Sequence, residues 1–259
     1  MVSRPAAKAW RRAHGLGWHN FYGQWPTLAD VPVTQEAPDS DPWAQTIVAG
    51  WRENIKAAAA QDHGDIRDII LPLLASRFTG RLTVLDFGGG PGVGLANILK
   101  FAQLNLSRLS YVLVETPAMC RIIRGEIETY SGKVVERIPD ALEKPLIVNA
   151  GSSLQYVSDY KSTLSQLARL APDIFIVSET PMSDQPTYAC QILNTPHRKM
   201  ATWVFNRAEF VAEMRKSGFG LVFAVARNPQ LTHKNAPGPF MLSSMVFSPM
   251  ARSPSAAPK

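Results

Sequence analysis

The 259 residues include 46% hydrophobic and 19% charged side chains, an ordinary globular composition that excludes an intrinsically disordered chain. No apolar run reaches the roughly 18 residues of a membrane-spanning helix, so we expect no such helix. Lys and Arg number 27 against 21 Asp and Glu, and the net charge of +6 fits a solvated surface. The same charge leaves anionic partners open: an acidic substrate, nucleic acid, or a membrane surface contacted peripherally.

The N-terminus and the cysteines indicate a cellular compartment. Arg4 and Lys8 are not followed by an apolar segment, so we do not expect a secretory signal. Cys120 and Cys190 are too few for a disulfide framework, and their positions lack metal-ligand spacing. We therefore expect no bound metal and a reducing, cytoplasmic location.

Residues 1–79 are expected to form an N-terminal extension that packs on the main body. Up to about residue 40 the segment is aromatic and rich in Pro and Gly without sustained periodicity, and we interpret it as an irregular or partly helical arm. A helical pattern follows at 42–60. Apolar residues at 66–74 then recur at helical spacing, with a kink expected at Pro72.

After residue 80, short apolar runs alternate with helical patterns, which is typical of parallel strands covered by helices on both faces. The last two runs have no helix between them, so the sheet is expected to end in a hairpin. We predict a Rossmann-like, seven-stranded α/β domain over 80–249, followed by a disordered tail at 250–259. The seven runs are residues 82–87, 110–114, 134–138, 146–149, 174–178, 220–226 and 240–247.

The clearest motif is a glycine-rich segment between the first run and the next helical pattern. Glycines let the backbone approach a ligand closely, and the following helix offers free N–H groups. The dinucleotide fingerprint needs glycines at relative positions one, three and six, which this segment lacks. The pattern Asp86-x-Gly88-x-Gly90-x-Gly92 is instead typical of S-adenosylmethionine sites. We predict that these residues and Gly89 bind that cofactor; a glycine turn without a ligand is the alternative.

Polar residues at three later strand ends extend this site. Glu115 ends the second run, 29 residues after the motif's aspartate, where a carboxylate accepts hydrogen bonds from ribose hydroxyls. Thr116 follows it at the start of a helix, and Ile138 is expected to contact the adenine ring. Asn149 and Ser152 lie at the end of the fourth run, at the expected mouth of the ligand crevice. The alternative for Glu115 is a solvated strand end, and for Ser152 a loop or helix start.

The acceptor pocket is predicted after the fifth run. The stretch from Met182 to Trp203 is long, polar and punctuated by prolines, and loops at this edge commonly bind substrates. His197 is the candidate general base, with Glu179 and Asp184 as carboxylate alternatives. A lone loop histidine is also compatible with a plain surface position.

At these residues the sequence resembles a bacterial group of class I methyltransferases that use S-adenosylmethionine. The similarity extends from about residue 18 to 247, and the Ser-Ser-Leu-Gln-Tyr segment at 152–156 points to this group. The resemblance implies a Rossmann-like fold, S-adenosylmethionine as cofactor, and a role beside polysaccharide or other surface-glycan pathways. The segments that carry it are Phe21-Tyr22-Gly23, Trp25, 84–94, 111–117, 149–156 and 175–181.

The predicted function is methyl transfer from S-adenosylmethionine, in particular O-methylation of a small-molecule or glycan acceptor. Transfer from a sulfonium is an in-line displacement that mainly needs positioning and exclusion of water, which fits a sequence without a triad or metal cluster. Two alternatives stay open. A nucleic-acid methyltransferase is disfavoured because the fourth run lacks an Asn/Asp-Pro-Pro-aromatic motif and basic runs with interleaved aromatics are missing beyond the first twelve residues. The other is a non-catalytic binding or scaffold protein. The oligomeric state is not predicted.

Overall fold

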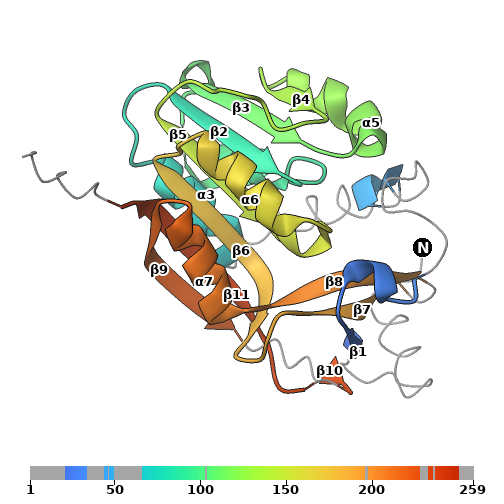
Figure 1. The fold of residues 1–259 in the computed structure, drawn as a ribbon. Coiled ribbons are helices and arrows are strands. Elements are labelled where there is room, and N and C mark those ends of the chain that lie inside the picture. Colours follow the sequence, from blue (N-terminus) through green and yellow to red (C-terminus); the bar gives the residue numbers. More distant parts are fainter. Residues whose placement is uncertain are drawn as a thin grey trace, which may run out of the picture.

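The centre of the protein is a seven-stranded sheet in the spatial order β9, β11, β6, β5, β2, β3 and β4 (Figure 1). The computed structural model describes residues 21–33, 44–45, 47–49, 66–102, 104–195, 198–227, 233–235 and 237–250. The strands are β2 (Leu82–Phe87), β3 (Leu109–Val114), β4 (Lys133–Val135), β5 (Leu146–Gly151), β6 (Ile174–Ser183), β9 (Phe219–Arg227) and β11 (Met241–Pro249).

The direction of the strands confirms the predicted topology. β11 is antiparallel to both β6 and β9, whereas β4, β3, β2, β5 and β6 pair in parallel. All seven predicted runs are strands of this sheet. β4 ends at Val135 instead of Ile138, and β6 continues past the predicted end to Ser183.

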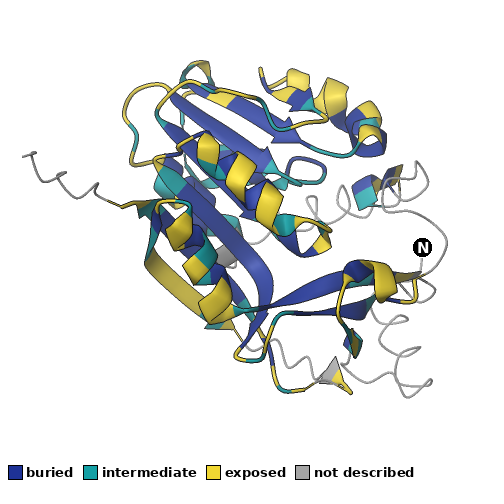
Figure 2. Ribbon diagram, viewed as in Figure 1, coloured by how far each residue is buried: buried dark blue, intermediate teal, exposed yellow. Residues whose placement is uncertain are grey.

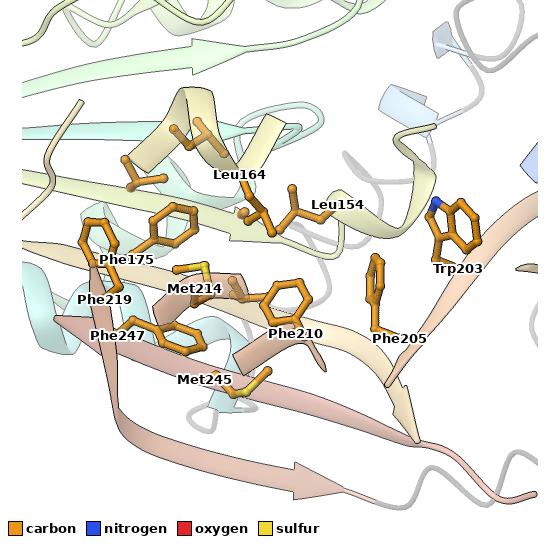
Figure 3. Packing of buried hydrophobic residues seen from close by; sticks show 14 of the residues in the cluster. Leu154, Leu164, Phe175, Trp203, Phe205, Phe210, Met214, Phe219, Met245 and Phe247 are labelled. Carbon is orange, nitrogen blue, oxygen red and sulfur yellow. The ribbon is translucent and has the colours of Figure 1, made fainter. Parts of the chain in front are cut away.

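Helices cover both faces of the sheet, as predicted. On one face, buried residues of three helices form a hydrophobic cluster with the strands. On the other face, buried residues of two helices form a second cluster with the strands, which we call the main cluster (Figures 1 and 2). Figure 3 shows part of the main cluster, in which Phe210 and Met214 pack with Phe175 and Phe247. The first three helices are α3 (Ile66–Ala75), α4 (Val93–Phe101) and α5 (Pro117–Glu128); the other two are α6 (Tyr160–Arg169) and α7 (Arg207–Lys216).

The helix boundaries follow from local sequence. The Asn206 side chain accepts a hydrogen bond from Glu209 N and caps α7, while the rings of Phe205 and Phe210 pack 5.4 Å apart across that cap. Pro72 lies inside α3, which continues through it.

Four strands that the sequence analysis did not predict form an accessory sheet. They lie in the order β10, β1, β7, β8, and β8 joins the end of β6 where Met182 pairs with Phe205. The predicted loop from Met182 to Trp203 is therefore wrong for the described residues, since most of them are strand. The four strands are β1 (Phe21–Trp25), β7 (Tyr188–Thr195), β8 (Arg198–Asn206) and β10 (His233–Lys234).

The accessory strands form because the hairpin β7–β8 buries side chains on both of its faces. Ala189 and Trp203 pack in the main cluster, whereas Cys190 and Val204 pack in a separate small cluster. Strands that are buried on both faces lack the alternating apolar and polar pattern by which a strand is recognised in a sequence. The prolines and polar residues of this segment therefore favoured the prediction of a loop.

The predicted N-terminal arm contains a strand where the structure describes it. Phe21 of β1 is buried, and its ring packs edge-on against Phe240 at 4.6 Å, in the small cluster that also contains Cys190 and Val204. Of the helix predicted at 42–60, the described residues 44–45 and 47–49 are helical. Ala44 and Val48 are buried in the same cluster as α3 and the sheet.

Two predictions concern residues that the structure does not describe. They are the role of His197 and the tail predicted at 250–259, of which only Met250 is described. The boundary between extension and main domain at residues 79 and 80 stays a prediction. No described helix combines the length and the apolar character needed to cross a bilayer.

Candidate functional site

The predicted site residues gather at the carboxyl ends of the central strands. β2 lies between β3 and β5, so the connections from these strands leave in opposite directions at this point. Ligands of open α/β sheets bind at such a switch point, outside the carboxyl ends of the strands. Asp86, Glu115 and Asn149 all lie at or directly after these ends.

Asp86 is the buried centre of the site and is 1% exposed. Its Oδ1 accepts a hydrogen bond from Asn149 Nδ2 at 2.7 Å, and its Oδ2 accepts one from the Tyr111 hydroxyl. The backbone N–H of Gly94, in α4, also donates to this carboxylate. Burial raises the pKa of Asp86, and the three hydrogen bonds oppose that rise. Asp86 therefore ties β2 to β3, β5 and α4.

Two glycines make room for this carboxylate. A Cβ atom at Gly89 or at Gly94 would overlap Asp86 Oδ2. At Gly94 it would also lie 3.1 Å from the Tyr111 hydroxyl and 3.1 Å from Leu71 Cδ2. Packing inside the protein is by itself enough to require glycine at these two positions.

Gly88 and Gly92 are also restricted by close packing. A Cβ at Gly88 would lie 2.5 Å from Ser153 Cβ, so the glycine loop presses against the segment that follows β5. A Cβ at Gly92 would lie 2.5 Å from Ile127 Cδ1 of α5. The loop is thus fixed on both sides by the fold.

Gly90 differs from the other described glycines between 88 and 94. Its φ of +58° is in the left-handed region that favours glycine, yet a Cβ placed there meets nothing within 4 Å. Its N–H donates to Glu115 Oε1 at 2.8 Å. The backbone at Gly90 therefore faces open space while its conformation is held by Glu115.

Glu115 links the loop to the next helix. Its second oxygen, Oε2, accepts a hydrogen bond from Thr116 N at 2.8 Å, and Thr116 Oγ1 caps α5 by accepting from Met119 N at 3.4 Å. Burial raises the pKa of Glu115, and the backbone N–H groups of Thr116 and Gly90 oppose that rise. Each carboxylate oxygen accepts one protein N–H and keeps a lone pair for a further donor.

The segment after β5 carries polar atoms without partners. Ser152 has a φ of +53°, its N–H donates to Ser178 O at 2.8 Å, and its Oγ accepts from Gln155 Nε2 at 2.9 Å. Ser153 Oγ and Gln155 Oε1 are buried, and neither has a hydrogen-bond partner among the described residues. Buried polar atoms are normally paired, and Ser153, which lies against Gly88, brings one unpaired oxygen to the glycine loop.

Glu179 lies one residue beyond Ser178, at the same edge. Its φ is +51°, and its N–H donates to Ser244 Oγ at 3.2 Å. The carboxylate is 4% exposed and is held by the Arg227 guanidinium, with Nε donating to Oε1 at 3.1 Å and Nη2 to Oε2. A left-handed conformation at a non-glycine residue is strained and concentrates at functional positions.

Two further predicted residues, Ile138 and Asp184, follow the ends of β4 and β6. Ile138 is partly buried in the loop after β4 and packs against the main hydrophobic cluster. Asp184 is exposed just past the end of β6. The roles assigned to these residues, to His197 and to the cofactor ligands stay predictions.

The sequence analysis missed Tyr111 and Arg227. Tyr111 stands inside an apolar strand and looked like a core residue. Ser153 was considered with Ser152 as either a ligand contact or part of a loop or helix start, and this choice stays open. Arg227 is 48 residues from Glu179, and only the tertiary fold brings the two together.

Comparison with solved structures identifies the fold. A methyltransferase of Methanosarcina mazei that depends on S-adenosylmethionine is 10% identical, with a TM-score of 0.50, and the match covers 70% of this chain and 98% of that one. A second match is a chain in the complex between the Trm112 methyltransferase activator of Haloferax volcanii and a methyltransferase. It is 14% identical, again with a TM-score of 0.50, and the match covers 81% of this chain and 99% of that one. The chain has the class I methyltransferase fold.

At these identities the likeness concerns the fold. No family model matches the sequence, and no curated protein matches it. The accessory strands β1, β7, β8 and β10 add to the seven predicted strands of the methyltransferase sheet.

Proposed function

We propose that this protein is a methyltransferase that binds S-adenosylmethionine at the glycine loop. The observation that carries the proposal is Gly90, where a left-handed backbone faces open space directly beside the Glu115 carboxylate. Glu115 holds this conformation, and a Cβ atom at Gly90 would meet no described atom within 4 Å. A ligand that approaches the backbone closely fits this arrangement.

The residues present fit the polar groups of this cofactor. The free lone pairs of Glu115 suit the two ribose hydroxyls, as at related nucleotide sites. The unpartnered Ser153 Oγ, beside Gly88, suits the amino-acid end. Asp86 is then a positioning residue for the loop, since its oxygens already accept three protein hydrogen bonds.

The chemistry asks little of the protein beyond orientation. When bound, the sulfonium group of the cofactor supplies an activated methyl group. The protein holds the acceptor oxygen in line with it and excludes water. Proton removal from a hydroxyl acceptor is assigned to His197 or Asp184. Glu179 is the third candidate, and its carboxylate is held by the Arg227 guanidinium.

We also propose that the acceptor is a hydroxyl of a small molecule or a glycan and that the enzyme is cytoplasmic. The support is the sequence resemblance to bacterial methyltransferases beside surface-glycan pathways. Incubation with cofactor carrying an isotopically labelled methyl group, together with nucleotide sugars or oligosaccharides as acceptors, tests this. Label transfer to DNA or RNA instead would replace the glycan by nucleic acid.

Calorimetric titration with S-adenosylmethionine and S-adenosylhomocysteine tests the cofactor. Gly90→Ala is expected to weaken binding by about tenfold or more, since one added methyl group blocks the backbone approach. Gly218→Ala is the matched control, because Gly218 also has a positive φ, +92°, and open space around its Cβ, but follows α7. Glu115→Gln is expected to lose about tenfold in affinity through the ribose contacts.

Each outcome decides between the readings. Binding that is lost in Gly90→Ala and kept in Gly218→Ala supports the cofactor site. Absence of binding by the folded wild-type protein refutes the proposal and favours a scaffold role. Binding without methyl transfer to any acceptor would leave a cofactor-binding, non-catalytic protein.

A further inference from the structure

The side chain of Gln155 carries a buried polar atom that has no partner in the fold. Gln155 lies in η3 (Leu154–Tyr156), shortly after β5, and is 2% exposed. Its Oε1 makes no hydrogen bond within the described part of the protein. A buried carbonyl oxygen without a partner lowers stability, so native proteins retain such an atom where a water molecule or a ligand pairs with it.

The nitrogen end of the same amide is fully engaged. Gln155 Nε2 donates to Ser152 Oγ at 2.9 Å, and the amide also hydrogen-bonds to the Tyr156 hydroxyl. Since Oε1 has no partner, the nitrogen makes this second bond too. A glutamine amide has two N–H donors and a carbonyl oxygen with two lone pairs. The two hydroxyls account for both donors, and the carbonyl oxygen is what remains for a further group.

Gln155 lies close to the proposed cofactor site. Ser153, two residues earlier, lies against Gly88 of the glycine loop, where we place the amino-acid end of the cofactor. Two residues of chain span at most about 7 Å, so the backbone of Gln155 lies within that distance of Ser153. Methyl transfer requires the acceptor oxygen to lie in line with the methyl group, beside the cofactor. An acceptor held by Gln155 fits this requirement.

Tyr156 and the accessory sheet flank the amide. Tyr156 is 37% exposed, so part of its ring is open to solvent. Burial raises the pKa of its hydroxyl, and Cys190 of β7 raises this pKa further, which places the hydroxyl near that strand. Trp203 Nε1 of β8 donates to Val157 O at 3.0 Å, directly after η3. An aromatic ring beside a few placed polar groups is typical of sites for small molecules.

We propose that Gln155 is a specificity-determining residue for the methyl acceptor, and that its Oε1 accepts a hydrogen bond from an acceptor hydroxyl group beside the Tyr156 ring. This inference rests on the proposed methyl transfer and names a residue that selects its substrate. A neutral carbonyl oxygen pairs with a donor such as a sugar hydroxyl and offers nothing to a carboxylate. An acceptor without that hydroxyl leaves the buried oxygen unpaired and is therefore rejected.

A permanently bound water molecule is the competing partner of Oε1. Gln155→Met separates the two cases, because it keeps the length of the side chain and removes the amide. Gln166→Met is the matched control: Gln166 Nε2 also donates to a serine, Ser162 Oγ at 3.3 Å, but this glutamine is exposed on α6.

Thermal unfolding shows whether the fold needs the amide. Gln155→Met is expected to keep its Tm within about 2 °C of the wild-type value, because the loss of one hydrogen bond is offset by the removal of an unpaired oxygen. A fall of more than about 4 °C would assign the amide to the fold, through bound water, and would overturn the proposal.

Isotopically labelled methyl transfer to nucleotide sugars and oligosaccharides tests the acceptor contact. For the acceptor that the wild-type protein methylates, Gln155→Met is expected to raise KM about tenfold, while kcat and the affinity for S-adenosylhomocysteine stay unchanged. Gln166→Met is expected to behave as the wild type. Deoxy analogues of that acceptor, each without one hydroxyl, test specificity. The wild-type protein is expected to discriminate against one of them about tenfold or more, and Gln155→Met is expected to lose this discrimination.

The outcomes separate this inference from the proposed function. Methyl transfer with the same KM and the same discrimination in Gln155→Met overturns the inference alone. Loss of affinity for S-adenosylhomocysteine in Gln155→Met would place the amide at the cofactor and would also overturn it. A folded wild-type protein that methylates none of these acceptors refutes the proposed glycan or small-molecule acceptor, and the inference with it.

Discussion

Removal of the Tyr111 hydroxyl is the sharpest test of how the glycine loop is held in place. Tyr111 and Asp86 are each 1% exposed, and the hydroxyl donates to Asp86 Oδ2. Tyr111→Phe keeps the ring and deletes only this donor. The surrounding loop is closely packed, since a Cβ at Gly94 would lie 3.1 Å from the hydroxyl oxygen. The carboxylate is then left with hydrogen bonds from Asn149 and Gly94 only.

The magnitude follows from the charge on the acceptor. A hydrogen bond to a buried charged group contributes about 1.5–3 kcal/mol, so Tyr111→Phe is expected to lower the free energy of unfolding by roughly 2 kcal/mol at neutral pH. In a chain of this length that corresponds to a fall in Tm of roughly 4–8 °C. Urea unfolding, followed by circular dichroism, measures the change. The double variant with Asp86→Asn shows whether the two effects are coupled.

The pH dependence supplies an independent check. Burial raises the pKa of Asp86 above its usual 3.8, and loss of a donor raises this pKa further. The variant's deficit is therefore full at pH values above the raised folded pKa, and it shrinks as the pH falls through that value toward 3.8. A variant within about 0.5 kcal/mol of the wild-type protein at neutral pH, or a deficit that does not change with pH, would refute this account of Asp86.

Two further predictions concern the same edge of the sheet. Gly94→Ala is expected to lower the free energy of unfolding by about 1–3 kcal/mol, because the added Cβ would overlap Asp86 Oδ2. Gly125→Ala is the control: this position has open space on α5, so the substitution is expected to be neutral or to stabilise by up to about 1 kcal/mol. Urea unfolding compares the two variants. Arg227→Gln is expected to lower the free energy of unfolding by roughly 2 kcal/mol, because the buried Glu179 carboxylate loses its charged partner. Glu179→Gln is expected to lower it less, because the Arg227 guanidinium is partly exposed to water. Equal Tm values for the last pair would contradict this asymmetry.

The methyltransferase sheet could be predicted because its signals are local. Apolar runs, helix caps and the glycine motif each depend on neighbours in the sequence, as the caps at Asn206 and Thr116 illustrate. The accessory sheet could not be predicted in the same way. Its hairpin is buried on both faces by segments distant in sequence, so β7 and β8 lack a simple alternation.

The sequence indicated candidate residues at strand ends that lie together in the fold, but not the contacts that their side chains make. Asp86 and Asn149 hydrogen-bond to each other, and their binding of the cofactor stays a prediction. The glycines look equivalent in the motif, yet Gly89 leaves room for a carboxylate and Gly90 faces open space. Such distinctions depend on tertiary packing, which a motif does not encode.

The long-range pairing of β1 determines the order in which this chain is able to fold. Phe21 in β1 pairs with Ile192 in β7 and with His233 in β10. During synthesis the first strand of the accessory sheet therefore waits until nearly the whole chain has emerged, while the βαβ units from β2 to β6 close over short separations. Contacts of high sequence separation form slowly. We expect a folding intermediate with the glycine loop assembled and the accessory sheet open, so that the nascent chain forms the carboxyl-end edge of its central sheet before its last layer is added.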